Sequence, residues 1–138
     1  MGTFNFNFRV TKSGAPYVTL SSFGIAFNDL SQEKLKRPEE IIIGFDEDKH
    51  AIGIKAYSGE KDVPTFTFAS KVRHNWVRIG CKDFMRYVAS LVKDQGIDFL
   101  TRGKSFIADF DDDTQTLIIV LDKEHMKTLP KGDNSTIV

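Results

Sequence analysis

Two short acidic segments carry the residue types that could bind a cation. Phe45-Asp46-Glu47-Asp48-Lys49-His50 returns later in the chain as Phe110-Asp111-Asp112-Asp113-Thr114-Gln115. The spacing Asp109-x-Asp111-x-Asp113 imitates the start of an EF-hand loop, but Thr114 stands where that loop requires Gly and Val120 where it requires a bidentate Glu. Because apolar residues precede each acidic centre and an alternating run follows it, we interpret both segments as tips of β-hairpins. No metal site is predicted, with weak divalent binding at the turns left as an alternative.

Nucleophilic chemistry has one candidate pair, Cys81 with His74. No third group that could orient the histidine is apparent, so we predict a protein that is not an enzyme and has no cofactor. A single cysteine among 138 residues excludes an intrachain disulfide and a cysteine-based zinc site, and it suits a reducing cytoplasm. We expect Cys81 to be a small core residue.

The remaining chemical feature is a basic segment interleaved with aromatic residues. Residues 66–108 carry eight Lys or Arg against three Asp, which gives +5, whereas residues 109–125 carry one Lys against six acidic residues, which gives −5. We predict that a basic face binds a phosphate backbone or a protein partner. The candidate residues are Lys71, Arg73, Trp76, Arg78, Lys82, Arg86 and Lys93. The alternative is an ordinary solvated face with Trp76 in the core.

The elements that position these residues follow from the periodicity. The chain is the size of one domain, and its twelve Phe residues favour a sheet-rich core. Alternating runs at 3–8, 17–20 and 65–68 predict strands. One helix is expected over 31–37, capped by Asn28 or Asp29, and a second from an Asp83 cap to Gly96, with an apolar stripe of Phe84, Val88, Leu91 and Val92.

The order of these elements is roughly β-β-α-β-β, twice. We therefore predict an α+β fold, mainly antiparallel sheet with two helices, in a single domain over 1–121 built from half-repeats 3–57 and 65–121. Residues 58–64 form the linker and residues 122–138 an irregular tail. Chance similarity of two hairpins is the alternative to duplication.

Residues 17–55 resemble the swapped-hairpin domains of the AbrB, SpoVT and MraZ type. Gly24-Ile25-Ala26-Phe27-Asn28 stands where those domains have a glycine segment, Leu30 and Leu35 stand on the short helix, and Ile41 to Ile54 forms the hairpin. Ile25 replaces the arginine of that family, and the second half offers only Gly80-Cys81-Lys82. The resemblance implies DNA binding.

The sequence thus predicts a non-enzymatic binding module, a nucleic-acid-binding regulator in the first hypothesis. The alternative is a protein-binding inhibitor or accessory protein of a phage or mobile element. No apolar run approaches the roughly 18 residues of a membrane span, so we expect a cytoplasmic protein without a membrane partner. Homo-oligomers are also expected, with Phe4-Asn5-Phe6-Asn7-Phe8 as the exposed strand edge.

Overall fold

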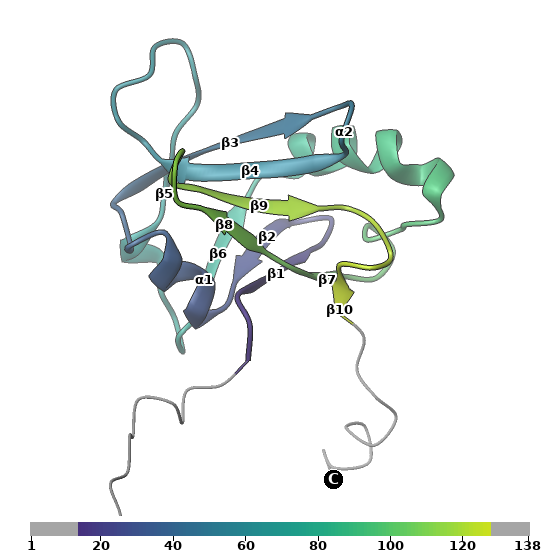
Figure 1. Ribbon diagram of the computed structural model, residues 1–138, viewed down its shortest axis with the longest axis horizontal. Coiled ribbons are helices and arrows are strands. Elements are labelled where there is room, and N and C mark those ends of the chain that lie inside the picture. The colour runs from purple at the N-terminus through teal and green to yellow at the C-terminus, as the bar shows by residue number, and fades with distance from the viewer. Residues whose placement is uncertain (1–13, 128–138) are drawn as a thin grey trace, which may run out of the picture.

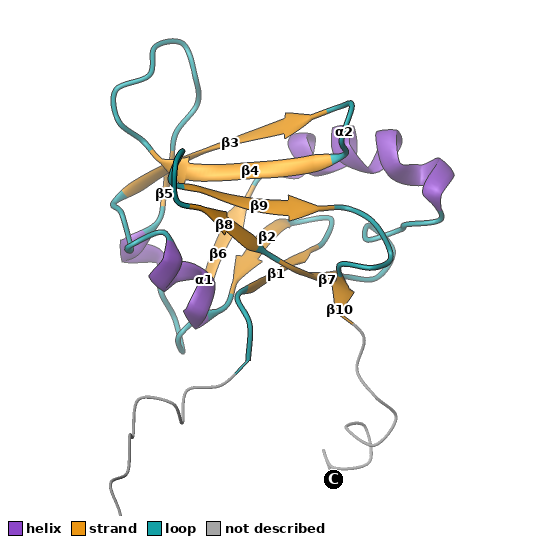
Figure 2. Cartoon of the chain, viewed as in Figure 1, coloured by secondary structure: helices purple, strands orange, loops and turns teal. Residues whose placement is uncertain are grey.

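The computed structural model describes residues 14–127 and contains two antiparallel five-stranded sheets (Figures 1 and 2). Sheet A has the order β10-β7-β1-β2-β6, and sheet B has the order β5-β3-β4-β9-β8. The strands are β1 (Tyr17–Leu20), β2 (Gly24–Phe27), β3 (Glu40–Asp46), β4 (Ala51–Ala56), β5 (Phe66–Thr67), β6 (Val77–Gly80), β7 (Lys104–Ile107), β8 (Asp109–Asp111), β9 (Thr116–Val120) and β10 (Met126–Lys127). The helices are α1 (Asp29–Lys34) and α2 (Lys82–Val92), with 3₁₀ turns η2 (Ala69–Lys71) and η3 (Lys93–Gln95). The α+β class predicted from the sequence is confirmed.

Each sheet combines strands from both predicted half-repeats. β1 and β2 pair with β7 and β6 in sheet A, and the hairpin β3-β4 joins the hairpin β8-β9 through the pair β4 and β9 in sheet B. Neither half therefore forms a sheet alone. Whether the halves arose by duplication stays a prediction.

The core lies between the two sheets. Strand residues alternate between buried and more exposed positions, as in β1, where Val18 and Leu20 are buried. Four phenylalanines are fully buried: Phe27, Phe68, Phe99 and Phe106. The rings of Phe27 and Phe68 meet edge to face with their centroids 5.0 Å apart.

The two acidic segments form equivalent hairpin turns. Asp46 Oδ1 accepts hydrogen bonds of 3.0 Å from the backbone N–H groups of Asp48 and Lys49, and Asp111 Oδ1 accepts one of 3.0 Å from Asp113. The last residue of each turn is left-handed, with φ 51° at His50 and 53° at Gln115. Hairpin tips were predicted at these places, and here the first aspartate of each tip satisfies its own turn.

Helix α1 is shorter than predicted. Asn28 is its N-cap, as one of the two predictions had it, but the helix ends before Lys36 and Arg37, which have φ of 65° and 48°. Leu35 is buried as expected, while Ser31 and Gln32 are buried as well. Gln32 donates from Nε2 to the carbonyls of Phe27 and Asn75 at 3.1 and 2.8 Å, which explains its burial.

Helix α2 begins two residues earlier than predicted. Cys81 is the N-cap, and Asp83 lies in the first turn, paired with Arg86, so the prediction of an Asp83 cap is wrong. The buried stripe is Met85, Val88 and Val92. Gly96 ends the following 3₁₀ turn with φ 76°, as a C-terminal glycine was expected to do.

The segment that leads into the second acidic hairpin divides at Ala108 into β7 in sheet A and β8 in sheet B. The irregular tail was placed from residue 122, but Met126–Lys127 pair with β7 as β10. The predicted edge strand at Phe4 to Phe8 lies outside the described residues.

Candidate nucleic-acid interface

The basic segment folds back on itself in a tight turn. Arg73 and Trp76 form an antiparallel bridge with backbone hydrogen bonds of 2.7 and 2.9 Å, and His74 and Asn75 between them both have positive φ, 52° and 68°. Two left-handed central residues are typical of a type I′ turn. The side chains of Arg73 and Trp76 consequently leave the same face of the backbone.

Strand β6 continues this face into sheet A. Val77 and Ile79 are buried toward sheet B, so Trp76 and Arg78 lie on the outer face. We call this surface the sheet A platform. Its residues are Tyr17, Thr19, Ala26, Arg73, Trp76, Arg78, Ser105, Ile107 and Lys127, placed by strand register and alternation.

One cross-strand row of the platform runs through all five strands of sheet A. In register it reads Lys127, Ser105, Thr19, Ala26 and Arg78. The hydroxyls of Thr19 and Ser105 are hydrogen bonded at 2.7 Å. Because strands are about 4.8 Å apart, this row spans roughly 19 Å. The row therefore has a cation at each end and short, uncharged side chains between them.

The neighbouring row carries two aromatic side chains. The rings of Tyr17 and Trp76 meet edge to face with centroids 5.7 Å apart, and Lys127 Nζ lies 4.8 Å from the centroid of the Tyr17 ring. Both rings are half-buried. Trp76 is therefore outside the buried core, which removes the alternative that it is a core residue.

The two sheets carry opposite charge. The described strands of sheet A contain three basic residues, Arg78, Lys104 and Lys127, and no Asp or Glu. The strands of sheet B contain one basic residue against four acidic ones: Lys55 against Glu40, Asp46, Asp109 and Asp111. The charge segregation seen along the sequence thus becomes a difference between sheets.

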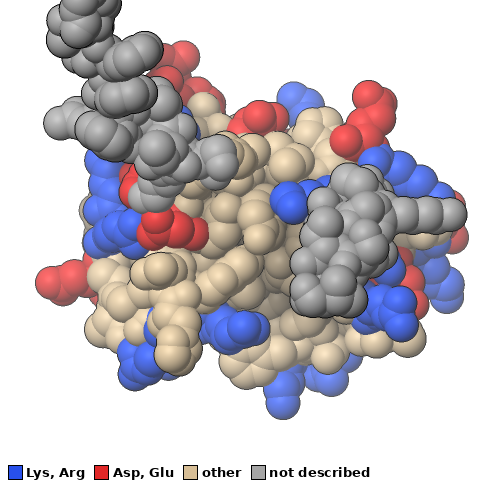
Figure 3. Space-filling model, turned by 90° about the horizontal axis from the view of Figure 1, so that it is seen from below, with Lys and Arg blue, Asp and Glu red and all other residues tan. Residues whose placement is uncertain are grey.

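Figure 3 shows the surface of the molecule from below. Strands β1, β7 and β10 of sheet A lie below sheet B in Figure 1, so this view looks from their side of the molecule. Tan surface occupies most of the centre, interrupted by a few Lys or Arg side chains, and further Lys and Arg side chains lie along its lower margin.

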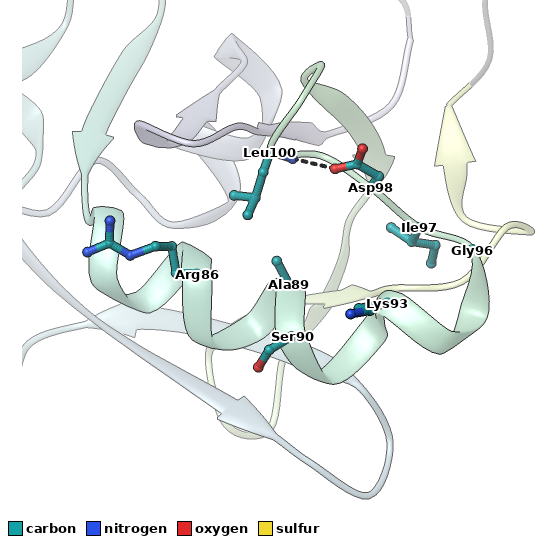
Figure 4. A pocket seen from close by; sticks show the side chains of 8 residues that line it. All are labelled: Arg86, Ala89, Ser90, Lys93, Gly96, Ile97, Asp98 and Leu100. Carbon is teal, nitrogen blue, oxygen red and sulfur yellow. Dashed lines mark hydrogen bonds between the residues drawn. The ribbon is translucent and has the colours of Figure 1, made fainter.

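The basic residues of α2 form a separate group. Lys82, Arg86 and Lys93 are all exposed and recur at a spacing that keeps them on one side of the helix. Arg86 and Lys93 line a groove of about 600 Å³ between α2 and the segment that follows it (Figure 4). Ala89 and Leu100 point toward each other across this groove, and Ile97 lies near its far end.

Charges in the groove are partly paired within it. Arg86 pairs with Asp83 in the first turn of α2. Asp98 Oδ1 accepts from the N–H groups of Leu100 and Thr101 at 3.1 and 3.2 Å, and hydrogen bonds from Thr101 hold the pKa of this carboxyl below its usual range. The groove therefore combines an apolar floor with ionised groups of both signs.

The predicted site residues do not all converge on one concave surface. Arg73, Trp76 and Arg78 lie together on the sheet A platform, whereas Lys82 and Arg86 lie on α2 and Lys93 follows it in η3. Lys71 is exposed at the end of η2. Tyr17 and Lys127 were missed: Tyr17 was recognisable only as a strand residue, and Lys127 falls in the stretch read as a tail.

The nucleophile pair considered in the sequence finds no support in the geometry. Cys81 is buried, and desolvation raises the pKa of its thiol to about 11, so the thiol is protonated at neutral pH. His74 is exposed in its turn. Within residues 14–127, no group of three His, Cys, Asp or Glu side chains is arranged to hold a metal ion.

Comparison with known proteins adds no homologue. No protein-family profile, curated protein or solved structure matches the chain. The resemblance of residues 17–55 to swapped-hairpin domains consequently stays a prediction. The part of the chain that the structure describes contains no helix with the length and apolarity that a membrane crossing needs.

Proposed function

We propose that this protein is a binding module that holds single-stranded nucleic acid on the sheet A platform. The observation that carries the proposal is the in-register row with Arg78 and Lys127 at its ends, next to the ring pair Tyr17 and Trp76. Proteins that bind single strands combine cations along the backbone path with aromatic side chains on which bases stack. The platform offers both, and its strands contribute no carboxylate.

The short side chains at the centre of the platform favour an extended single strand of nucleic acid as the ligand over a protein partner. Thr19 and Ser105 are short and half-buried, and Ala26 beside them is buried, so this row has no long side chain between Arg78 and Lys127. Arg73, Arg78 and Lys127 supply three cations for phosphate contacts. Three contacts predict a slope of log K against log salt of about −2 for a single strand.

The test uses Trp76, the one tryptophan of the chain. Titration with a 20-nucleotide oligothymidylate at about 50 mM salt should quench Trp76 fluorescence and raise the anisotropy of a labelled oligonucleotide over the same range. Arg78→Ala should weaken binding and reduce the salt slope by about 0.7. Tyr17→Ala should weaken binding about 5- to 100-fold, the range expected for loss of one stacked base, while Tyr17→Phe should retain most of it.

Lys61→Ala is the matched control, because Lys61 is an exposed cation on the loop between β4 and β5. It should leave affinity and salt slope unchanged. Absence of binding at low salt, binding without any change at Trp76, or equal losses in the Arg78 and Lys61 variants would each contradict the proposal.

A second candidate function rests on the α2 groove. Its apolar floor of Ala89 and Leu100 with the cations of Arg86 and Lys93 suits an acidic amphipathic helix from a protein partner. An acidic amphipathic peptide of about five turns should shift the amide resonances of residues 86–100 and leave the platform unchanged. A basic peptide of the same apolar pattern is the control, and equal shifts with both peptides would contradict this candidate.

A further inference from the structure

Sheet B has an outer face that is apolar. Register and alternation place Ile41, Ile43 and Phe45 of β3 toward sheet A, together with Ile52 and Ile54 of β4. The residues that alternate with these along each strand lie on the outer face. These are Ile42, Gly44, Ala51, Gly53, Ile118 and Val120, with Lys55 and Thr116 beside them and Asp46, Asp109 and Asp111 along the margins.

Two glycines form a hollow in the middle of this face. Gly44 and Gly53 are directly opposite each other on β3 and β4, and Ile118 of β9 is next to Gly53 in the same row. A Cβ on Gly44 would meet nothing within 4 Å, and one on Gly53 would meet only Thr116 Cγ2 at 3.4 Å. Two depressions of about 540 and 380 Å³ share both glycines, so the hollow continues to either side.

The composition of the strands indicates that this face is covered in solution. β9 contains four consecutive apolar residues, Leu117 to Val120, and β3 contains three, Ile41 to Ile43. Such continuous runs are typical of strands covered on both faces, whereas a sheet with one wet face alternates apolar and polar residues. Sheet A covers one face only. On the other, Gly44 is exposed and Ile42, Ile118 and Val120 are half-buried.

We propose that the outer face of sheet B binds a second copy of this chain. In this dimer the two-fold axis lies between the facing sheets, parallel to β4 and β9 and midway between them. It places Ile118 of each copy over Gly53 of the other copy. A two-fold interface must be self-complementary, and this face carries both the projecting side chain and the hollow that receives it. Lys55 of each copy then lies near Thr116 and within one strand spacing of Asp111 of the other copy.

The size and charge of the face determine the strength of the dimer. Four strands of about five residues make a patch of roughly 350 Å², smaller than the roughly 800 Å² per partner of a standard interface. We therefore expect a dissociation constant in the micromolar range or weaker. Asp46, Asp109 and Asp111 repel across the interface, so the dimer should strengthen as salt screens them.

The test is sedimentation velocity of the full chain from about 5 to 500 μM, at low and high salt. The wild type should pass from the 15.6 kDa monomer to a species of twice that mass. Gly44→Glu should raise the dissociation constant at least tenfold at low salt, because it fills the hollow and places a carboxylate over Asp109 of the other copy. Gly44 has open space and an ordinary φ, so the variant should fold, which its circular dichroism and melting temperature will show.

Ser22→Glu is the matched control, since it adds the same side chain at an exposed position between β1 and β2, away from sheet B. It should dimerise like the wild type. A wild-type monomer up to 500 μM, a dimer that survives Gly44→Glu, or equal loss in the Ser22 control would overturn the proposal. Association that weakens with salt would instead indicate packing of sheet B of one copy on the basic sheet A of another, and would also overturn it.

Discussion

Asn28 joins three segments of the chain through one side chain. Its Oδ1 accepts hydrogen bonds from the N–H groups of Tyr17 at 3.0 Å and Ser31 at 2.9 Å, and its Nδ2 donates to the Ala15 carbonyl at 3.0 Å. The same residue therefore caps α1 and fixes the start of β1, where Tyr17 enters the platform. A helix cap is worth about 1 kcal/mol, and the two further bonds add to it.

Asn28→Ala should lower the free energy of unfolding by about 2–3 kcal/mol, measured by urea denaturation, because three side-chain hydrogen bonds disappear. Asn28→Asp keeps the acceptor and should cost less. Since β1 loses its anchor, the alanine variant should also bind oligothymidylate more weakly. Equal stability of the wild type and Asn28→Ala would contradict this role.

Glu60 organises the loop between β4 and β5. The backbone N–H of Ser58 donates to Oε1 at 2.8 Å and the Ser58 hydroxyl to Oε2 at 2.9 Å, with Lys55 Nζ 3.5 Å away. These contacts favour the ionised carboxylate, and the hydrogen bond from the Ser58 backbone is the main cause that lowers the Glu60 pKa to about 2.

Because the pKa in the folded protein lies below the value of 4.5 for an unperturbed glutamate, ionised Glu60 stabilises the loop. The contribution is complete above about pH 4.5 and is lost as the pH falls through about 2. Carboxyl ¹³C titration should give a midpoint near 2 for Glu60, with faster amide exchange at residues 58–60 below it. A midpoint near 4.5 would show that the contacts do not persist in solution.

At the scale of elements, the pairing of β2 with β6 depends on a close backbone approach. An added Cβ at Gly24 would lie 1.9 Å from the Ile79 carbonyl oxygen and 2.9 Å from the Cys81 nitrogen. Gly24 is paired with Gly80 in this register, and Cys81 N donates to the Phe23 carbonyl at 3.0 Å. The pairing holds Arg78 beside Ala26 and thus completes the platform row.

Gly24→Ala should therefore lower the free energy of unfolding by about 3 kcal/mol or more, since the neighbours are backbone atoms that cannot move aside cheaply. Gly44→Ala is the matched control in sheet B, where an added Cβ meets open space. It should be neutral or stabilising by about 0.5 kcal/mol. Similar melting temperatures for the two variants would refute the close approach.

The two hairpin tips connect the sheet B hairpins to the helical segments. The tip of β3-β4 contacts α2 through a hydrogen bond from Tyr87 to Glu47, and it contacts η3 through one between Gln95 and His50. The tip of β8-β9 accepts a 3.2 Å hydrogen bond from Lys36, just after α1. Each tip thus contacts the helical segment of the opposite half. The acidic turns consequently serve to join the halves.

At the scale of the whole molecule, the opposite charge of the two sheets orients an approaching anion. For the proposed nucleic-acid ligand, we expect attraction by the cations of sheet A and repulsion by the carboxylates of sheet B, so that encounter occurs on the platform side. Charges far from the contact change the rate of association more than the rate of dissociation.

Neutralising Asp109 and Asp111 together as asparagines should raise the association rate with oligothymidylate about twofold at low salt and leave the dissociation rate unchanged. Stopped-flow fluorescence at Trp76 measures both rates. The gain should vanish at about 0.5 M salt because screening removes the long-range field. A change confined to the dissociation rate would place these aspartates in the contact itself.

Local interactions were predictable from the sequence because neighbouring residues make them. The acidic turns at Asp46 and Asp111, the glycine end at Gly96 and the class of fold all followed from spacing and turn chemistry. The basic residues of the candidate site could also be identified from the sequence, because the excess of Lys and Arg over Asp and Glu in residues 66–108 can be counted directly.

Pairing over long distances was decided by the tertiary structure. A period of two places residues on alternate faces of a strand, but it does not say which strand lies beside it or what covers each face. Only the fold divided the run at Ala108 between two sheets, brought Tyr17 to Trp76 and Lys127 to Tyr17, and separated Arg78 from the basic residues of α2. The sequence by itself therefore determined which groups could bind a partner. The strand register of sheet A determined which of these groups lie next to one another, because a side chain contacts only its neighbours on the same strand and on the adjacent strands.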